Sequence, residues 1–89
     1  MDRGVQVGAF LRLSTATRYV NNAMLLAPEI LTRDKAAILP SETPSGRVYR
    51  ARFGPFNEAS ANTACGLLEA KGMDCFPIRE NKWTGAIRP

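Results

Sequence analysis

The sequence predicts an α+β domain of the ferredoxin-like βαββαβ type, in which a four-stranded antiparallel sheet carries two helices on one face. The first observation is a repeat: segments 5–10 and 49–56 both alternate apolar and polar residues and contain a Gly-x-Phe sequence. The second is that an Ala-rich stretch with helical spacing follows each copy. Alternation is typical of a strand with one buried and one solvated face. Duplication of a strand–helix unit therefore indicates one sheet with helices on one side.

The first unit is expected to be a strand at residues 5–10, followed by a helix that ends at about Ala27. Gln6 alternates with two valines in the strand, so it is expected on the solvated face. Apolar residues recur at i, i+3, i+4 and i+7 along the helical stretch and form a stripe that faces the core. Ser14 or Thr15 is a suitable N-cap, and the proline after Ala27 ends the helix.

Two further strands are expected in the middle of the chain. The first is short and covers residues 36–39, and the second covers residues 47–53. Residues 41–46 between them are rich in turn formers and are expected to be a loop. In the later strand Arg50 and Arg52 alternate with apolar residues, so both arginines are expected on the solvated face.

The chain is expected to close with a helix, a strand and a tail. Asn57 is a suitable N-cap for this helix, and Gly72 is expected to end it in a left-handed conformation. The fourth strand is expected at residues 73–79, and Trp83 is expected to pack over a sheet edge rather than contact a ligand. These boundaries divide the chain into a linker at residues 1–4, one domain at 5–79 and a C-terminal tail at 80–89.

Length and composition limit what the chain is expected to do. Its 89 residues, of which 45% are hydrophobic and 22% charged, suit one folded domain. The sequence contains no apolar run long enough to span a membrane and no secretory signal, so we expect a domain excised from a larger protein. Histidine is absent, and no pair of carboxylates or phosphate-binding loop stands out. We therefore expect no enzyme activity, no cofactor and no metal site.

Cys65 and Cys75 are the two cysteines of the chain. Cys65 lies on the apolar stripe of the second helix and Cys75 on the strand that follows, so the pair is able to form a disulfide in an oxidising compartment. The alternative is two buried free thiols that pack as small hydrophobic residues. If Cys75 faces the helix, alternation brings Phe76 onto the solvated face; otherwise Phe76 is a displaced core residue.

The solvated sheet face is the expected binding surface. The topology places the first and third strands at the centre and the fourth beside the first, so Gln6, Arg50 and Phe76 are expected in one lateral row. Such a row suits a carbohydrate, because an aromatic ring stacks on a sugar, an amide pairs with hydroxyl or acetamido groups, and an arginine binds a carboxylate in bidentate fashion. The alternative is that Arg50 and Arg52 are only the solvated side of an amphipathic strand.

With these residues laid out, the chain resembles SPOR domains, the peptidoglycan-binding modules of bacterial cell-division and cell-wall proteins. The resemblance covers residues 5–79, most of the chain. It rests on Val-Gln-Val-Gly-Ala-Phe at 5–10 and on Tyr-Arg-Ala-Arg-Phe-Gly-Pro-Phe at 49–56. The Ala-rich helix, Gly72 and a closing strand complete the pattern, and together these pieces are fairly specific.

The resemblance implies a non-catalytic module whose open sheet face holds glycan strands that lack stem peptides. The Gln of the family's opening motif corresponds to Gln6, its Arg four residues before Gly-Pro to Arg50, and its apolar contact on the last strand to Phe76. Ala9 stands where the family often has Ser, so one hydroxyl contact is missing or replaced. We hypothesise that Arg50, together with Arg52, reads the lactyl carboxylate that each muramic acid exposes once its peptide is removed.

The resemblance also implies a periplasmic location, at the septum where the parent protein acts in division. The cysteine pair and the Tyr-Arg-Ala-Arg-Phe run are similar to SPOR domains at the C-termini of some D-alanyl-D-alanine carboxypeptidases, which makes such an enzyme one candidate parent and a cell-division protein another. We expect a monomer that reaches the membrane at most through its parent protein.

Other functions share this topology. A single-stranded RNA-binding domain of the RNP type uses the same face, and the net charge of +4 is compatible with it. Such domains stack bases on aromatic residues of the central strands, however, whereas Tyr49 and Phe53 are expected to face inward, so we expect no nucleic-acid partner. An acylphosphatase-like enzyme needs a better phosphate-binding loop than residues 8–12 offer. A plain protein-interaction domain remains as a further alternative.

Overall fold

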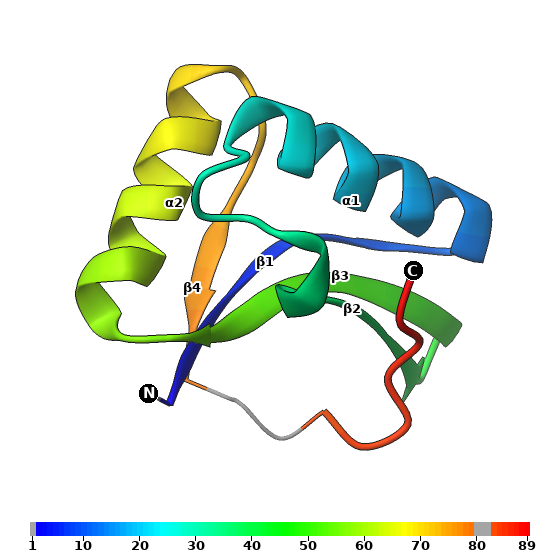
Figure 1. Ribbon diagram of the computed structural model, residues 1–89. Helices are drawn as coiled ribbons and strands as arrows, with labels where there is room; N and C mark the ends of the chain where they lie inside the picture. The colour runs from blue at the N-terminus through cyan, green and yellow to red at the C-terminus, as the bar shows by residue number, and fades with distance from the viewer. Residues whose placement is uncertain (1, 80–82) are drawn as a thin grey trace.

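The computed structural model describes residues 2–79 and 83–89 and has the predicted element order. In chain order the elements are β1 (Arg3–Phe10), α1 (Leu13–Leu26), the short 3-10 helix η1 (Arg33–Lys35), β2 (Ala36–Thr43), β3 (Gly46–Phe56), α2 (Glu58–Ala70) and β4 (Phe76–Ile78). The strands form one antiparallel sheet in the order β2-β3-β1-β4. Both helices lie on the same side of this sheet (Figure 1). The predicted βαββαβ fold is confirmed.

The hydrophobic core lies between the sheet and the two helices. The largest side chains with almost no exposure are Phe53, Leu31, Ile38, Leu68, Val5 and Val20. They come from three strands, both helices and the segment after α1, so every layer contributes to the core. Small residues on the inner faces of the helices, such as Ala16, Ala23 and Ala64, are fully buried and let the helices approach the sheet closely.

The two middle strands are longer than predicted, and the loop between them is shorter. Their ladder is continuous from the Ala36–Phe53 pair to the Thr43–Gly46 pair, so the loop expected at residues 41–46 is wrong. A tight hairpin turn replaces it. The Thr43 hydroxyl donates to the Gly46 carbonyl at 2.7 Å, and Gly46 has a φ of 118°, which residues with a Cβ rarely adopt.

The predicted boundaries of α2 agree with the structure, whereas those of the last strand agree only in part. The Asn57 side chain accepts a hydrogen bond from the backbone N–H of Ser60 at 2.7 Å, so its prediction as the N-cap is confirmed. Gly72 has a φ of 87° just after the helix, as expected for a left-handed C-terminal residue. The strand predicted at residues 73–79 is too long, because β4 pairs with β1 only at residues 76–78.

The start of α1 also differs from the prediction. The helix begins at Leu13, and Arg12 occupies the N-cap position in an extended conformation without a side-chain capping bond. Ser14 and Thr15 therefore lie inside the first turn, and neither is the cap. Packing of the buried stripe against the sheet stabilises this helix in place of a polar cap.

Cys65 and Cys75 form a disulfide, with an S–S distance of 2.10 Å and a Cα–Cα distance of 5.0 Å. Both residues are buried, so the alternative of two free thiols is wrong. The bridge ties α2 to the residue that enters β4. Because Cys75 points toward the helix, the next residue, Phe76, points to the other side of the sheet.

Candidate functional site

The candidate site is the open face, the side of the sheet that the helices leave uncovered (Figure 1). Strand pairing determines which side chains share it, because residues directly opposite one another on neighbouring strands point the same way. One row crosses all four strands through Phe76 on β4, Gln6 on β1, Arg52 on β3 and Ala37 on β2. A second row, nearer the end of β1, contains Ala9, Arg50 and Leu39.

This register corrects the predicted lateral row. The residue opposite Gln6 on β3 is Arg52, whereas Arg50 lies opposite Ala9. A register shift between Gln6 and Gly8, where β1 has one residue more than β3, contributes to the pairing of Arg50 with Ala9. The extra residue brings Ala9 rather than Gly8 beside Arg50. The arginine and the amide that were expected side by side thus belong to neighbouring rows.

Arg52 is buried, with an exposed fraction of 8%. Its Nε donates a hydrogen bond to the Gln6 Oε1 atom at 2.9 Å. The expectation that Arg52 lies in solvent is therefore wrong, although it does point to the open face. The contact orients the amide of Gln6, because it assigns the oxygen to the guanidinium and directs the NH₂ group away from it.

Arg50 is half-buried, and its Nε donates to the Ser41 hydroxyl at 3.2 Å. Among the described residues, no carboxylate or carbonyl takes its two terminal nitrogens. A guanidinium that is anchored through Nε presents the remaining fork for bidentate binding of a planar anion. Arg50 therefore has the geometry that carboxylate recognition needs.

Phe76 is 57% exposed and lies on the open face, as the register argument from Cys75 predicted. An exposed aromatic ring of this kind is a platform for the apolar face of a sugar. Beside it is an open groove of about 290 Å³, lined among others by Ala9, Tyr19 and Asp74. The side of the face that carries β4 therefore combines an aromatic platform with a recess.

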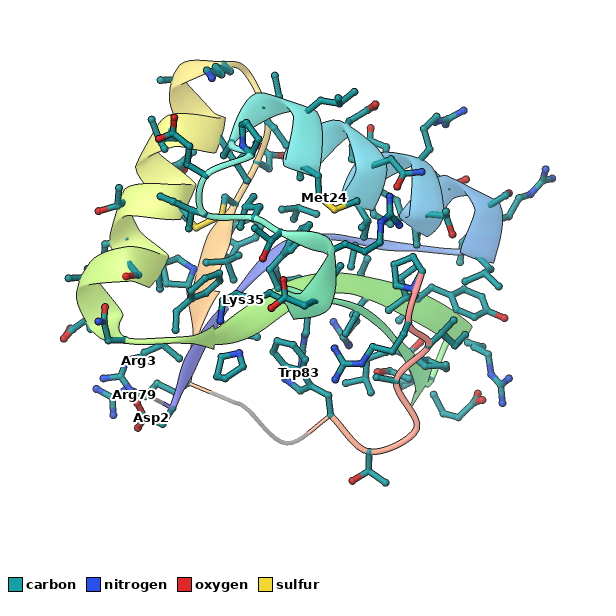
Figure 2. The ribbon with its side chains drawn as sticks, in the orientation of Figure 1. Asp2, Arg3, Met24, Lys35, Arg79 and Trp83 are labelled. Carbon is teal, nitrogen blue, oxygen red and sulfur yellow. A yellow bond between two sulfur atoms is a disulfide. The ribbon has the colours of Figure 1, made fainter. Side chains whose placement is uncertain are left out.

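Trp83 packs against the open face at Gly54, a residue of the central strand β3 (Figure 2). A Cβ atom at Gly54 would lie only 2.6 Å from the Trp83 ring, so the absence of a side chain makes room for the indole. The expectation that Trp83 packs is confirmed, and the ring lies at Gly54, one residue beyond the last pair of β3 with β2. Its indole N–H has no acceptor in the described part of the chain, so shape and apolar contact hold the ring.

The residues after Trp83 reach the outer edge of β2. Ile87 and Ile38 exchange two backbone hydrogen bonds of 2.8 and 2.7 Å. The Arg88 side chain donates to the carbonyl of Ala36 at 3.0 Å. Sequence reasoning gave this tail no structure, because it has no periodic pattern. The paired bonds show that it is docked on the sheet.

The two strand rows of the open face are positively charged, whereas the recess beside Phe76 has the carboxylate of Asp74 in its wall. The two rows of the open face carry Arg50 and Arg52 and no acidic residue. The Arg47–Glu42 ion pair, at 2.7 Å, lies on the opposite side of the hairpin by alternation, and its hydrogen bond raises the pKa of Arg47. Within the described ranges, no group of three or more potential ligand residues is able to hold a metal ion.

The aromatic residues of β3 face the helices. Phe53 is fully buried and Tyr49 packs against the core cluster. The described central strands therefore offer no aromatic side chain on the open face for stacking bases, which is the arrangement that RNP-type RNA binding requires. None of the helices in the described ranges is long and apolar enough to cross a membrane.

The family model of the SPOR domain matches residues 3–79. This match covers most of the chain, so the protein belongs to the SPOR domain family. No curated protein and no solved structure gave a significant match. A SPOR domain is a non-catalytic peptidoglycan-binding module of the cell envelope, and the Cys65–Cys75 disulfide is consistent with the periplasm.

Proposed function

We propose that this SPOR domain binds peptidoglycan glycan strands from which the stem peptides have been removed, and that the open face is the binding surface. The observation that carries the proposal is the combination of an exposed aromatic ring, Phe76, with the anchored guanidinium of Arg50 on one face that has no acidic residue in its rows. A polymer of sugar rings with periodic carboxylates matches both features.

Each residue has a separate role in this proposal. Phe76 stacks on the apolar face of a sugar ring, and Gln6 donates from its NH₂ group to a hydroxyl or acetamido oxygen. Arg52 holds Gln6 in place through the 2.9 Å hydrogen bond. Ala9 is exposed between Phe76 and Arg50 and offers a small apolar contact where a serine would offer a hydroxyl.

Arg50 supplies the preference for glycans without peptides. When an amidase removes the stem peptide, the lactyl group of muramic acid gains a free carboxylate, which Arg50 binds through its terminal nitrogens. An intact peptide replaces this carboxylate by a neutral amide and adds bulk over the sheet. We infer that the domain thereby directs a larger cell-wall or cell-division protein, such as a D-alanyl-D-alanine carboxypeptidase, to regions of the wall that amidases have processed, including the septum.

Cosedimentation with peptidoglycan sacculi tests the proposal. We expect the protein to be retained more strongly after the sacculi are treated with an amidase than before, because treatment exposes carboxylates and removes steric blocks. Sacculi that are incubated with heat-inactivated amidase serve as the control. Equal retention on treated and control sacculi would contradict the proposed preference, and retention on neither would reject peptidoglycan glycan as the ligand.

Substitution of Arg50 tests the carboxylate contact. A hydrogen bond between charged groups is worth about 1.5 to 3 kcal/mol, so Arg50→Gln should weaken binding to amidase-treated glycan roughly ten- to a hundredfold. Arg50→Lys should keep part of the affinity, because it retains the charge but not the fork. Arg18→Gln, at an exposed position of α1 on the helical side, is the matched control. Unchanged affinity in both Arg50 variants would remove Arg50 from the mechanism.

A further inference from the structure

The C-terminal segment, residues 83–89, packs on the open face at Trp83 and along the outer edge of β2 at Ile87. It is not part of the family match, which ends at residue 79. It passes below the sheet, on the side away from the helices, and rises beyond β2 (Figure 1). The Trp83 ring fixes it to the central strand at Gly54, and the Ile87–Ile38 bonds fix it to the outer edge. Because the segment is held at both places, it forms part of the surface that a ligand contacts.

Two open-face residues are buried at the end of the sheet where this segment docks. Ala37 has an exposure of 0%, yet only its neighbours Ala36 and Ile38, and not Ala37 itself, belong to the core cluster. Arg52 lies directly opposite Ala37 and is 8% exposed. Two side chains that point away from the helices and still have almost no exposure must be covered from the open side. The open face is therefore closed at its Ala37–Arg52 end.

The residues that remain accessible follow a diagonal across the four strands. Phe76 on β4 and Ala9 on β1 are exposed, and four neighbours are half-buried: Gln6 on β1, Arg50 on β3, and Leu39 and Ser41 on β2. Phe76 lies at the level of Gln6, Ala9 and Arg50 lie one row further toward the end of β1, and Ser41 lies beyond them. The accessible path thus leads away from the docked segment as it crosses from β4 to β2.

We propose that the C-terminal segment is a strap that confines the glycan to this diagonal, so that Arg50 contacts the ligand and Arg52 does not. The inference rests on the proposed glycan function and adds the part of the face that the glycan occupies. Under it Arg52 is a positioning residue for Gln6, and the strap determines both the length of glycan in contact and its direction across the sheet. The ligand leaves the strap in place and does not cover Trp83.

Trp83 is the one tryptophan of the chain, so its fluorescence reports the strap directly. In Gly54→Ala the new methyl group would lie 2.6 Å from the indole and must displace it. This variant should show a red-shifted emission and stronger quenching by acrylamide, and it calibrates the signal of a displaced strap. Gly66→Ala is the matched control, because apart from the neighbouring residues and backbone of α2 nothing lies within 4 Å of that Cβ position, and it should leave both signals unchanged.

The decisive measurement is the fluorescence of the native chain saturated with soluble glycan fragments prepared by amidase treatment. We expect the emission and the quenching to stay at the values of the free protein, and we expect folded Gly54→Ala to bind the fragments at least as tightly. A red shift like that of Gly54→Ala, protection of Trp83 from acrylamide, or loss of binding in folded Gly54→Ala would each overturn the strap while the glycan function stands. Absence of binding by the native chain would instead reject the glycan function, and the strap inference with it.

Discussion

Removal of the disulfide, in a chain that carries both Cys65→Ala and Cys75→Ala, is expected to lower the free energy of unfolding by about 2 to 4 kcal/mol. The two cysteines are separated by 10 positions in the sequence, and a cross-link stabilises the fold by restricting the unfolded chain. Small domains have a total stability of about 5 to 15 kcal/mol, so the loss is a large share. Urea unfolding followed by circular dichroism measures it.

The same double variant is expected to bind glycan more weakly, because the bridge positions β4. This strand has three residues, and its strand partner in the described ranges is β1, so the disulfide adds a covalent link to α2 beside that short ladder. Reductant should reproduce both losses in the native chain and change nothing in the double variant, which is the control. Equal urea midpoints with and without the bridge would show that packing alone holds β4, and would contradict the predicted contribution of the disulfide.

The fold could be predicted because its determinants are local. Alternation marked the strands, helical spacing marked α1 and α2, and the residues at the ends of α2, Asn57 and Gly72, have the conformations that their types favour. The disulfide followed from one further step, since a helix and the next strand of this topology pack together. The position of Phe76 on the open face depended on that step and is confirmed by its pairing with Gln6.

The register of the site could not be predicted, because it depends on contacts between strands far apart in sequence. The register of β1 on β3 determines that Arg52 and not Arg50 lies opposite Gln6, and the one-residue shift between Gln6 and Gly8 then places Ala9 opposite Arg50. The sequence carries only an indirect signal, the glycine at position 8, and in the structure the Phe10 ring occupies the space that a Cβ of that residue would need. A glycine at that point is compatible with a bulge but does not specify one.

The docked tail was missed for a different physical reason. A repeated pattern in the sequence indicates a helix or a strand. The C-terminal segment has no such pattern and is held by single contacts at Trp83, Ile87 and Arg88. The partner of Trp83 is Gly54, which the sequence pattern indicates only as part of the Gly-x-Phe repeat and the Gly-Pro motif at the end of a strand. The burial of Arg52 could not be predicted for the same reason. Alternation predicts the direction of a side chain but not what covers it.

Truncation of the aromatic platform, Phe76→Ala, is expected to weaken binding to amidase-treated glycan at least tenfold, which corresponds to about 1.4 kcal/mol. The ring is 57% exposed in the free domain, so stacking on a sugar removes additional apolar surface of both partners from water. Its exposure also means that the free energy of unfolding should change by no more than about 0.5 kcal/mol. Isothermal titration with soluble glycan fragments, together with urea unfolding, measures both quantities.

Leu25→Ala is the matched control for this experiment, because Leu25 is a large apolar residue of α1 that is 78% exposed on the other side of the sheet. Loss of its side chain should leave glycan binding unchanged. If Phe76→Ala also left binding unchanged while Arg50→Gln abolished it, the ligand would be recognised by charge alone. A soluble polyanion such as polyglutamate should then compete as well as the glycan does, whereas stacking on Phe76 requires sugar rings and makes the polyanion a poor competitor.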